Sequence, residues 1–531
     1  MPLWNKVKTQ VDRFQVKPGM TITIKIHLNN INQIIMRTSE KFDIESYKER
    51  QMAFPEISYD EFRWIDDMEL RKEIAGKNKI LSTDAYNRTM TYLKWDKKAR
   101  AIETYTLTFR KSPNFVFNVV YWVRNIIKKI IAKKFTQAEL DFAADFYAEQ
   151  AKKWANGYFN KALWQEVVDN WGQLPLEIMA VDDGTVLKPG EPVMSITGPW
   201  ELAAVFEPEL LRIFFQSVVA TDMRYIENII WEWRVVEFGK RAAVNEQAHV
   251  DAMEALYVWG WVVGTSNDIA AAAIPQLKAS GTTAHRYLAS YATENEAFLN
   301  AIEKTDKIAL LVDLVDSYKW IDKIIALKKE YRGKWKVIFM RLDSWDLVDQ
   351  AIYALNKQKE AWLLDPSKDK IVVADISNVD KIREIEAKVL EAGFDPKDFI
   401  VYGLGWLLVA KNKLRDAVSA AFKLTQTEEF DTWKLSNDAW KEAIPGNQNI
   451  EIRDWARYIV QDEEEVWWER LLKKVYSRGE LFFEWTDVEA IEKARANVIK
   501  TEKLLELPTK KSDLTIRKQR EVRERFMSIW A

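Results

Sequence analysis

Residues 337–344 read VIFMRLDS. The run from Val337 to Leu342 is apolar except for Arg341, and a carboxylate and a hydroxyl follow it. An apolar run of this length is typical of a strand buried in a parallel sheet. The residues that follow place apolar side chains at a spacing of three and four, which predicts one face of a helix. These residues are Leu347, Val348, Ala351, Ile352 and Leu355. The stretch therefore predicts one strand followed by one helix.

The same alternation continues on both sides of this stretch. Apolar runs at 308–315, 371–374 and 399–402 predict three more strands. Apolar residues at helical spacing in 321–327 and 379–390 predict helices between them. Strands that alternate with helices form parallel βαβ units, so the sequence predicts an α/β sheet or barrel.

Polar residues and glycines follow each of these predicted strands. Ligands of parallel α/β folds bind at the carboxyl ends of the strands. The ends carry Asp313 and Asp316, then Arg341 and Asp343, then Asp375, then Gly403 and Gly405. Four successive strand ends therefore predict one binding site.

Several of these residues have two possible roles, one in binding a ligand and one in the structure alone. Asp343 and Ser344 are good N-cap types, and the helix start that follows them offers free N–H groups to a phosphate. An ordinary capped helix explains them equally well. Arg341 is suited to bidentate binding of a carboxylate, or to a structural pair with Asp313 or Asp375.

Gly403 and Gly405 allow close approach of the backbone to a ligand, or simply form a tight turn. His285 lies in a loop of small residues, where an imidazole can shuttle a proton, accept a phosphoryl group or have no chemical role. The two other histidines, His27 and His249, have no partners by spacing, and we expect them to be structural. No Walker A motif, dinucleotide fingerprint, zinc spacing or nucleophile elbow occurs.

Composition sets broad limits. The 531 residues predict two to four domains, and a net charge of −2 gives no sign of a nucleic-acid partner. No uncharged apolar stretch approaches the ~18 residues of a membrane span, and no signal-peptide core begins the chain. The apolar segment 115–123, with Arg124 beyond it, predicts a buried helix with a wet basic edge; membrane contact is the alternative. The absence of cysteine excludes disulfides and thiolate sites and fits a reducing cytosol.

Glycine and tryptophan are present in abnormal numbers. The chain has 17 Gly and 24 Trp, whereas average usage predicts roughly 37 glycines. The deficit and the excess are similar in size. Some bacteria read the codon UGA as glycine, and another genetic code reads it as tryptophan. We hypothesise that many of these tryptophans are glycines in the native organism.

Ordered motifs across residues 79–455 resemble those of the nicotinate phosphoribosyltransferase family. They are STDAY at 82–86, FRK at 109–111, AVDDGT at 180–185, FGKR at 238–241, GTSN at 264–267, GTTAH at 281–285, LVD at 311–313, RLDS at 341–344, KLS at 434–436 and PG at 445–446. The resemblance implies an irregular parallel β/α barrel of the type II phosphoribosyltransferase kind, with an α+β domain built from N-terminal and C-terminal segments. The expected boundaries are an extension of unknown role at 1–78, an N-terminal domain at 79–200, a catalytic barrel at 201–415 and a C-terminal segment at 416–531 that packs on the N-terminal domain.

The resemblance also implies a reaction of NAD salvage. Nicotinate and phosphoribosyl pyrophosphate become nicotinate mononucleotide and pyrophosphate, with magnesium and with ATP hydrolysis. It further implies a cytoplasmic homodimer with shared active sites.

Roles follow by motif position. The pyridine ring would lie between Phe238 and a partner chain's Tyr86, with Arg341 beside it. Arg241 would bind phosphate, and Gly403 and Gly405 would approach the 5′-phosphate. ATP would phosphorylate His285, which acts with Asp313 and Asp343.

Four further positions complete the expected site. Asp343 and Asp375 would hold ribose or magnesium, and Ser280 would contact substrate. Relatives that use nicotinamide carry an aspartate at the position of Ser266, which would repel a carboxylate. Serine therefore favours nicotinate.

Some positions depart from the family pattern. Trp345 stands where the family has glycine, and Trp406 stands where it has a small residue. Trp261 and Trp440 fall where glycine is usual, and Ala242 replaces a second arginine. An indole at 345 would fill substrate space. Two alternatives follow: a catalytically inactive relative that binds nucleotide or protein, and a nicotinamide phosphoribosyltransferase.

Overall fold

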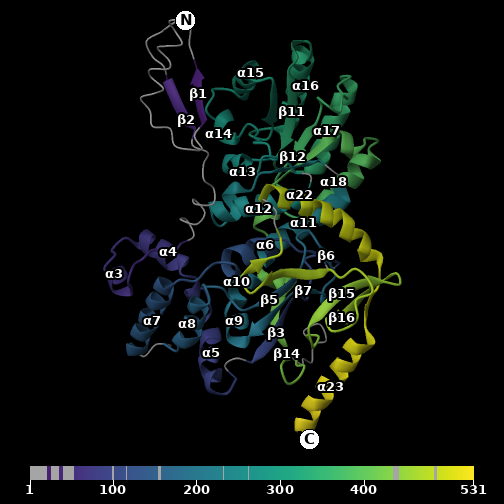
Figure 1. Ribbon diagram of the computed structural model, residues 1–531. Coiled ribbons are helices and arrows are strands. Elements are labelled where there is room, and N and C mark those ends of the chain that lie inside the picture. Colours follow the sequence, from purple (N-terminus) through teal and green to yellow (C-terminus); the bar gives the residue numbers. More distant parts are fainter. Residues whose placement is uncertain are drawn as a thin grey trace, which may run out of the picture. The chain divides into compact units, whose positions relative to one another are not determined.

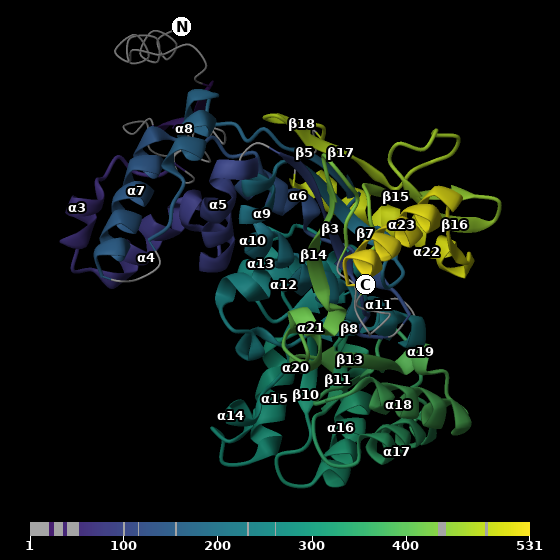
Figure 2. The same ribbon diagram turned by 90° about the horizontal axis from the view of Figure 1, so that it is seen from below.

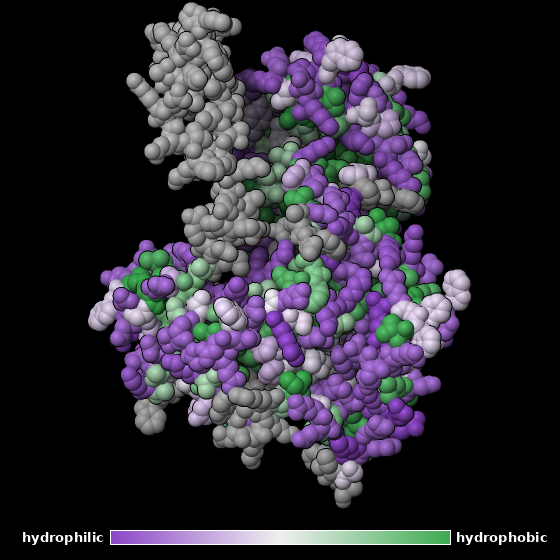
Figure 3. All heavy atoms as spheres, viewed as in Figure 1, coloured by the Kyte–Doolittle hydropathy of each residue, from purple (hydrophilic) through white to green (hydrophobic). Residues whose placement is uncertain are grey.

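The computed structural model describes residues 21–25, 35–39, 53–98, 101–114, 116–153, 157–230, 233–260, 262–433, 442–483 and 487–530 (Figure 1). The chain divides into two compact units, residues 1–81 and residues 82–531. Hydrophilic side chains cover most of the described surface on the face shown in Figure 3. Within the described ranges, no helix combines the length and the apolarity needed to cross a membrane.

The described part of the first unit contains a pair of antiparallel strands and short helices. Strand β1 (Thr21–Lys25), in which threonine and isoleucine alternate, pairs antiparallel with β2 (Ile35–Ser39). Helices α3 (Tyr59–Arg63) and α4 (Met68–Lys77) follow, and η1 (Lys79–Leu81) ends the unit. Ser58 caps α3 through a reciprocal capping box with Glu61.

A six-stranded parallel sheet forms the centre of the second unit. Its strands are β8 (Val235–Glu237), β9 (Val262–Thr265), β10 (Lys307–Leu311), β11 (Val337–Leu342), β12 (Ile371–Val373) and β13 (Ile400–Leu404). They are ordered β10-β11-β12-β13-β8-β9, and every neighbouring pair is parallel. The sheet curls into a half-barrel, which confirms the predicted fold class.

Helices cover this sheet between the strands, as the alternating pattern predicts (Figures 1 and 2). They include α11 (Phe214–Ile230), α12 (Glu246–Trp259), α13 (Asp268–Ala273), α14 (His285–Leu288), α15 (Glu294–Lys304), α16 (Ser317–Tyr331), α17 (Leu347–Glu360), α18 (Val379–Glu391), α19 (Pro396–Phe399), α20 (Trp406–Val409) and α21 (Arg415–Val418). On α17, Leu347, Val348, Ala351 and Leu355 are buried, so the predicted apolar face is the one that packs inward.

A second sheet combines strands from both ends of the unit. Its order is β14 (Ala420–Thr427), β3 (Ile102–Phe109), β7 (Pro192–Pro199), β5 (Glu177–Val181), β17 (Leu472–Ser477) and β18 (Glu480–Leu481). Around it lie α5 (Ala85–Lys98), α7 (Gln137–Lys152), α8 (Lys161–Asp169), α9 (Trp200–Val205) and α10 (Glu207–Leu211). A smaller sheet of β15 (Gln448–Arg453), β16 (Ala456–Gln461) and β19 (Thr509–Lys511), together with α22 (Asp487–Glu502) and α23 (Asp513–Trp530), completes the chain.

A buried ion pair ties the C-terminal strands to the N-terminal part of this unit. Arg457 on β16 donates from Nε to Glu191 Oε1 at 2.8 Å and from Nη2 to Oε2 at 2.5 Å. Both side chains are at most 1% exposed. Removing one partner of such a pair costs about 3–5 kcal/mol, because the other charge remains buried.

The prediction of a helix at 115–123 is wrong. Strand β4 (Asn118–Val119) pairs with β6 (Val186–Leu187), and α6 (Val123–Ile126) begins only at the end of the predicted segment, followed by η2 (Ile127–Ile131). The Val119 N–H donates to the Thr221 hydroxyl on α11 at 2.8 Å, which a helix would not allow. The predicted solvent exposure of Arg124 is wrong as well, because this residue is 6% exposed and pairs with Asp182.

Candidate active site

The carboxyl ends of the parallel strands bring the predicted residues together. Asp313 follows β10, Asp343 follows β11 and Asp375 follows β12, while Phe238 and Ser266 follow β8 and β9. The strand order places these ends next to one another along one edge. The predicted convergence is therefore present in the fold.

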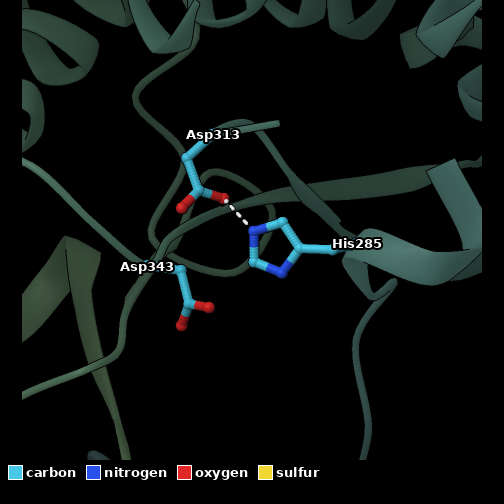
Figure 4. Close-up of side chains that lie close together, drawn as sticks. All are labelled: His285, Asp313 and Asp343. Carbon is cyan, nitrogen blue, oxygen red and sulfur yellow. Dashed lines mark ion pairs between the residues drawn. The ribbon is translucent and has the colours of Figure 1, made fainter. Parts of the chain in front are cut away.

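An imidazole and two carboxylates form the centre of this edge (Figure 4). His285 Nε2 lies 3.2 Å from Asp313 Oδ1, and ligand atoms of His285, Asp313 and Asp343 all lie within 4.8 Å of one another. The His285 side chain is 50% exposed whereas that of Asp313 is 2% exposed. The buried carboxylate therefore faces a ring whose other side is open to solvent.

The loop that carries His285 is fixed to the neighbouring strands. Thr283 donates its N–H to the Ala309 carbonyl at 3.0 Å and accepts from the Leu311 N–H through its hydroxyl at 2.9 Å. The Ser280 N–H donates to the Thr265 carbonyl at 2.8 Å. Since both ends of the loop are tied to strands, the start of α14 has a defined position.

Arg341 forms an ion pair with Asp343 and not with Asp313 or Asp375, the partners of the structural alternative. Its Nη2 and Nε donate to Asp343 Oδ1 at 2.6 and 3.2 Å, and its Nη1 donates to the Thr282 hydroxyl at 2.7 Å. The guanidinium carbon lies 5.6 Å from the centre of the Phe238 ring. Arg341 is thus held beside an aromatic face.

The N-cap predicted at Asp343 and Ser344 is also wrong. Helix α17 is capped by Asp346, whose side chain accepts from the N–H groups of Val348 and Asp349. Asp343 is occupied by Arg341, and the Ser344 hydroxyl donates to Asp313 Oδ2 at 2.5 Å. These two side chains therefore bond to Arg341 and Asp313 at the strand ends and do not cap the helix.

Gly403 and Gly405 make room for Phe238. A Cβ on Gly403 would lie 2.6 Å from Phe238 Cε2, and one on Gly405 would lie 2.9 Å from the Phe238 carbonyl oxygen. Neither glycine lies at positive φ, so a strained turn does not explain them. In the structure they give close approach to a protein ring and its backbone.

The carboxyl group of Asp375 lies among other charged side chains. Its backbone is left-handed at φ 56°, and partial burial, followed by the negative charges of Asp343 and Asp313, raises the pKa of its carboxyl. The charges of Arg341 and the exposed Arg241 oppose this shift. Three carboxylates and two guanidinium groups therefore share one region.

A buried network beneath the site was not predicted. Glu237, the last residue of β8, lies 3.0 Å from His249 Nε2 and accepts from the Thr265 hydroxyl at 2.8 Å. His249 Nδ1 lies 3.0 Å from the Asn267 amide, which also bonds Glu246 and Lys240. Glu237, His249 and Asn267 are fully buried, so the network fixes the ends of β8 and β9. A charged residue in an apolar strand was the only signal in the sequence.

Tyr86 lies elsewhere in its own chain. It is on α5, away from the parallel sheet in both views (Figures 1 and 2), and its hydroxyl donates to Glu207 on α10. Burial and the Glu207 carboxylate raise its pKa. Ser266 is exposed at the end of β9, where its N–H donates to the Glu237 carbonyl at 2.9 Å.

Two of the unusual tryptophans stand at the site. Trp345 is 72% exposed and left-handed at φ 69°. Trp406, the first residue of α20, is 51% exposed and does not have positive φ. Trp261 and Trp440 lie outside the described residues.

Solved structures share this fold. A human nicotinic acid phosphoribosyltransferase superimposes with a TM-score of 0.60 over 83% of this chain and 99% of that chain, at 17% identity. A nicotinate-nucleotide pyrophosphorylase from Pyrococcus furiosus gives a TM-score of 0.60 over 84% and 98%, at 18% identity. The chain therefore has the fold of these two proteins.

Family models narrow the assignment. The model of the nicotinate phosphoribosyltransferase N-terminal domain matches residues 81–214, and that of the nicotinate phosphoribosyltransferase family matches residues 233–434. The chain belongs to the nicotinate phosphoribosyltransferase family.

Curated relatives agree with this assignment. A nicotinate phosphoribosyltransferase of Mycobacterium tuberculosis is 26% identical over 390 residues, covering 72% of this chain and 76% of that protein. One of Bacillus subtilis is 27% identical over 277 residues, covering 51% and 54%. A nicotinamide phosphoribosyltransferase of Xanthomonas campestris is 24% identical over 418 residues, covering 69% and 84%.

Proposed function

We propose that this chain transfers the phosphoribosyl group of phosphoribosyl pyrophosphate to nicotinate, a step of NAD salvage. One observation carries the proposal: a guanidinium, an aromatic face and three carboxylates meet at the ends of parallel strands. The products are nicotinate mononucleotide and pyrophosphate.

Phe238 and Arg341 suit an aromatic carboxylate. The Phe238 ring offers a flat apolar face, and Arg341 offers donors beside it that can bind a carboxylate. Ser266 adds no negative charge at the end of β9, whereas an aspartate there would repel the carboxylate of nicotinate and accept a bond from an amide. Nicotinate is therefore favoured over nicotinamide.

The carboxylates suit the transition state. The pyridine nitrogen attacks the ribose C1 while the bond from C1 to the pyrophosphate oxygen breaks, so positive charge develops on the ribose. Asp343 and Asp375, fixed at adjacent strand ends, stabilise that charge. The leaving pyrophosphate needs cationic partners, and Arg241 lies within electrostatic reach of Asp375 to supply one.

The site also suits magnesium. The Oδ1 atom of Asp313 is buried, and its one recorded polar neighbour among the described residues is His285 Nε2, 3.2 Å away and outside hydrogen-bond geometry. Burial, followed by the charges of Asp343 and Asp313, raises the pKa of Asp375. Magnesium prefers oxygen ligands, so Asp343 and Asp375 would hold it, beside Asp313. When bound, the ion would neutralise charge on pyrophosphate oxygens.

His285 is the proposed acceptor of a phosphoryl group from ATP. Asp313 faces Nε2 and orients the ring, while half of the side chain is open to solvent. The γ-phosphoryl group moves to an imidazole nitrogen as ADP leaves, and water later releases phosphate. This step couples ATP hydrolysis to the transfer.

We assign the remaining stacking partner to a second copy of the chain. Tyr86 is half exposed on α5 and away from the sheet of its own chain. A homodimer in the cytoplasm, in which each chain lends Tyr86 to the other's Phe238, completes the ring site.

Pyrophosphate release tests the proposal. Purified chain with magnesium and phosphoribosyl pyrophosphate should release pyrophosphate with nicotinate and little with nicotinamide. Asp343→Asn is the inactive control, because the amide cannot keep the charge that Arg341 balances. A preference for nicotinamide would replace the assigned substrate. No turnover, even in a Trp345→Gly chain, would favour a silent relative.

A further inference from the structure

Tryptophan is concentrated at backbone positions that favour glycine. Among the described residues, twelve non-glycine positions have positive φ, and seven of them are tryptophan. They are Trp122, Trp171, Trp233, Trp335, Trp345, Trp362 and Trp455, with φ between 56° and 86°. Bulky L-residues avoid this region because Cβ collides with the backbone, and only glycine enters it freely. No propensity of tryptophan explains this distribution.

Two consecutive helices of the half-barrel provide an internal comparison. Helix α18 ends with Ala392, Gly393 and Phe394: Gly393, at φ 86°, donates its N–H to Leu390, and Phe394 donates to Val389. This is the double hydrogen bond of a Schellman motif, with glycine at its left-handed position.

Helix α17 ends in the same way with tryptophan in that position. Ala361, Trp362 and Leu363 follow the helix, and Trp362 has φ 60°. Its N–H donates to Lys359 at 3.1 Å, and that of Leu363 donates to Gln358 at 2.8 Å. Leu363 is buried at 4%, as Phe394 is at 5%, while Trp362 is 93% exposed. At the left-handed position, where the motif strongly favours glycine, one ending has Gly393 and the other has Trp362.

The end of α8 repeats the substitution. Trp171, at φ 59°, follows the C-cap Asn170, and the next N–H, that of Gly172, donates to Val167 at 3.0 Å. Trp171 is 82% exposed. The indole again contributes no packing that would offset its backbone strain.

The two-residue hairpins give a second comparison. Strands β17 and β18 are joined by Arg478 and Gly479, both at positive φ, between the paired residues Ser477 and Glu480. Strands β15 and β16 are joined by Asp454 and Trp455, at φ 46° and 56°. A turn with two left-handed residues strongly favours Asp-Gly or Asn-Gly. Trp455, 88% exposed, stands where that glycine belongs.

Two tryptophans on ordinary backbone pack against aromatic side chains. Trp164 is 3% exposed and packs on Phe135, with ring centres 5.2 Å apart. Trp320 meets Phe298 edge-on at 4.9 Å. Six of the seven left-handed tryptophans are instead at least 51% exposed; Trp122 alone is buried, at 8%. The left-handed positions are thus filled mainly by exposed tryptophans, whereas Trp164 and Trp320 pack against aromatic rings.

We infer that the six exposed left-handed tryptophans are glycines in the protein that the native organism makes, because it reads UGA codons as glycine. The six are Trp171, Trp233, Trp335, Trp345, Trp362 and Trp455. This inference depends on the positive φ of these six residues and is independent of the proposed phosphoribosyl transfer. One of the six, Trp345, directly follows Asp343-Ser344 in the chain, so the native site has a glycine in that turn.

The gene and the native protein give the direct test. The six codons should read UGA, and the codons for Trp164 and Trp320 should read UGG. Peptide masses from the native organism should then show glycine at the six positions. UGG codons or tryptophan masses at these positions would overturn the inference.

Thermal stability gives an independent test on the recombinant full chain. Replacing Trp171, Trp362 and Trp455 with glycine should raise Tm by about 1–2 °C per position, because strain is relieved. The matched control replaces Trp64, Trp467 and Trp468, which are also exposed but have no positive φ, and should not raise Tm. A Tm gain in the control, or none in the first set, would contradict the backbone argument.

The Trp345→Gly chain separates this inference from the proposed reaction. If the codons read UGA and nicotinate turnover appears only with glycine at 345, both stand. If the codons read UGA and neither chain releases pyrophosphate, the codon inference stands and the proposed function fails.

Discussion

Gly403→Ala should move the ring on which nicotinate is proposed to stack. The added Cβ would lie 2.6 and 2.7 Å from two carbons of Phe238 and 3.2 Å from Ala374 Cβ. Strand β13 cannot retreat, because β12 and β8 pair with it on both sides. The Phe238 ring must therefore shift, away from its place 5.6 Å from Arg341.

The expected loss follows from that overlap. Inserting a methyl group into a packed site costs about 1–3 kcal/mol, which corresponds to roughly 5- to 150-fold in kcat/KM if the cost falls on the transition state. Steady-state pyrophosphate release should show the loss mainly in the nicotinate dependence. The assay uses the parent chain, or the Trp345→Gly chain if only that chain turns over.

Two comparisons make the result interpretable. Gly333→Ala is the matched control, because nothing lies within 4 Å of its Cβ, and its kcat/KM should be unchanged. Adding Phe238→Leu to Gly403→Ala should recover stability without recovering activity. An unchanged kcat/KM for Gly403→Ala would refute the reasoning. A change confined to the KM for phosphoribosyl pyrophosphate would also refute it and would favour a contact between Gly403 and the 5′-phosphate.

Three further predictions concern charge. His285→Ala should abolish the coupling of ATP hydrolysis but leave some uncoupled turnover; an unchanged ATP requirement would contradict the role of the imidazole. Ser266→Asp should lower kcat/KM for nicotinate more than for nicotinamide, since the new carboxylate repels only the former; equal losses would argue against this position as a selector. Burial raises the pKa of Glu254 to about 7. Between pH 4.5 and pH 7 the folded state therefore keeps a proton that the unfolded state loses. The free energy of unfolding falls as the pH rises through this range, by up to about 3 kcal/mol. Glu254→Gln should flatten that slope in denaturant unfolding at pH 5 and pH 8; an unchanged slope would refute it.

The parallel sheet was predictable from sequence because most residues of its strands are apolar and buried. The run at 337–342 matches β11 residue for residue. The run at 308–315 was extended too far, because the chain leaves the strand after Leu311 to present Asp313. Apolarity alone does not distinguish a strand from the loop that follows it and carries Asp313.

The errors have local causes. Asp343, Ser344 and Asp346 are all good N-cap types, and only the left-handed turn at 345 decides that Asp346 caps α17. The apolar segment 115–123 lacks periodicity, so its pairing with β6 was invisible. Partners in the network of Glu237, His249 and Asn267 come from different elements and leave no spacing pattern.

A crystal structure of the chain with nicotinate mononucleotide tests the central claim most directly. The pyridine ring should lie on Phe238 with its carboxylate in hydrogen-bond distance of Arg341, and the ribose should face Asp343 and Asp375. A nucleotide bound away from the ends of β8, β11 and β12 would contradict the account.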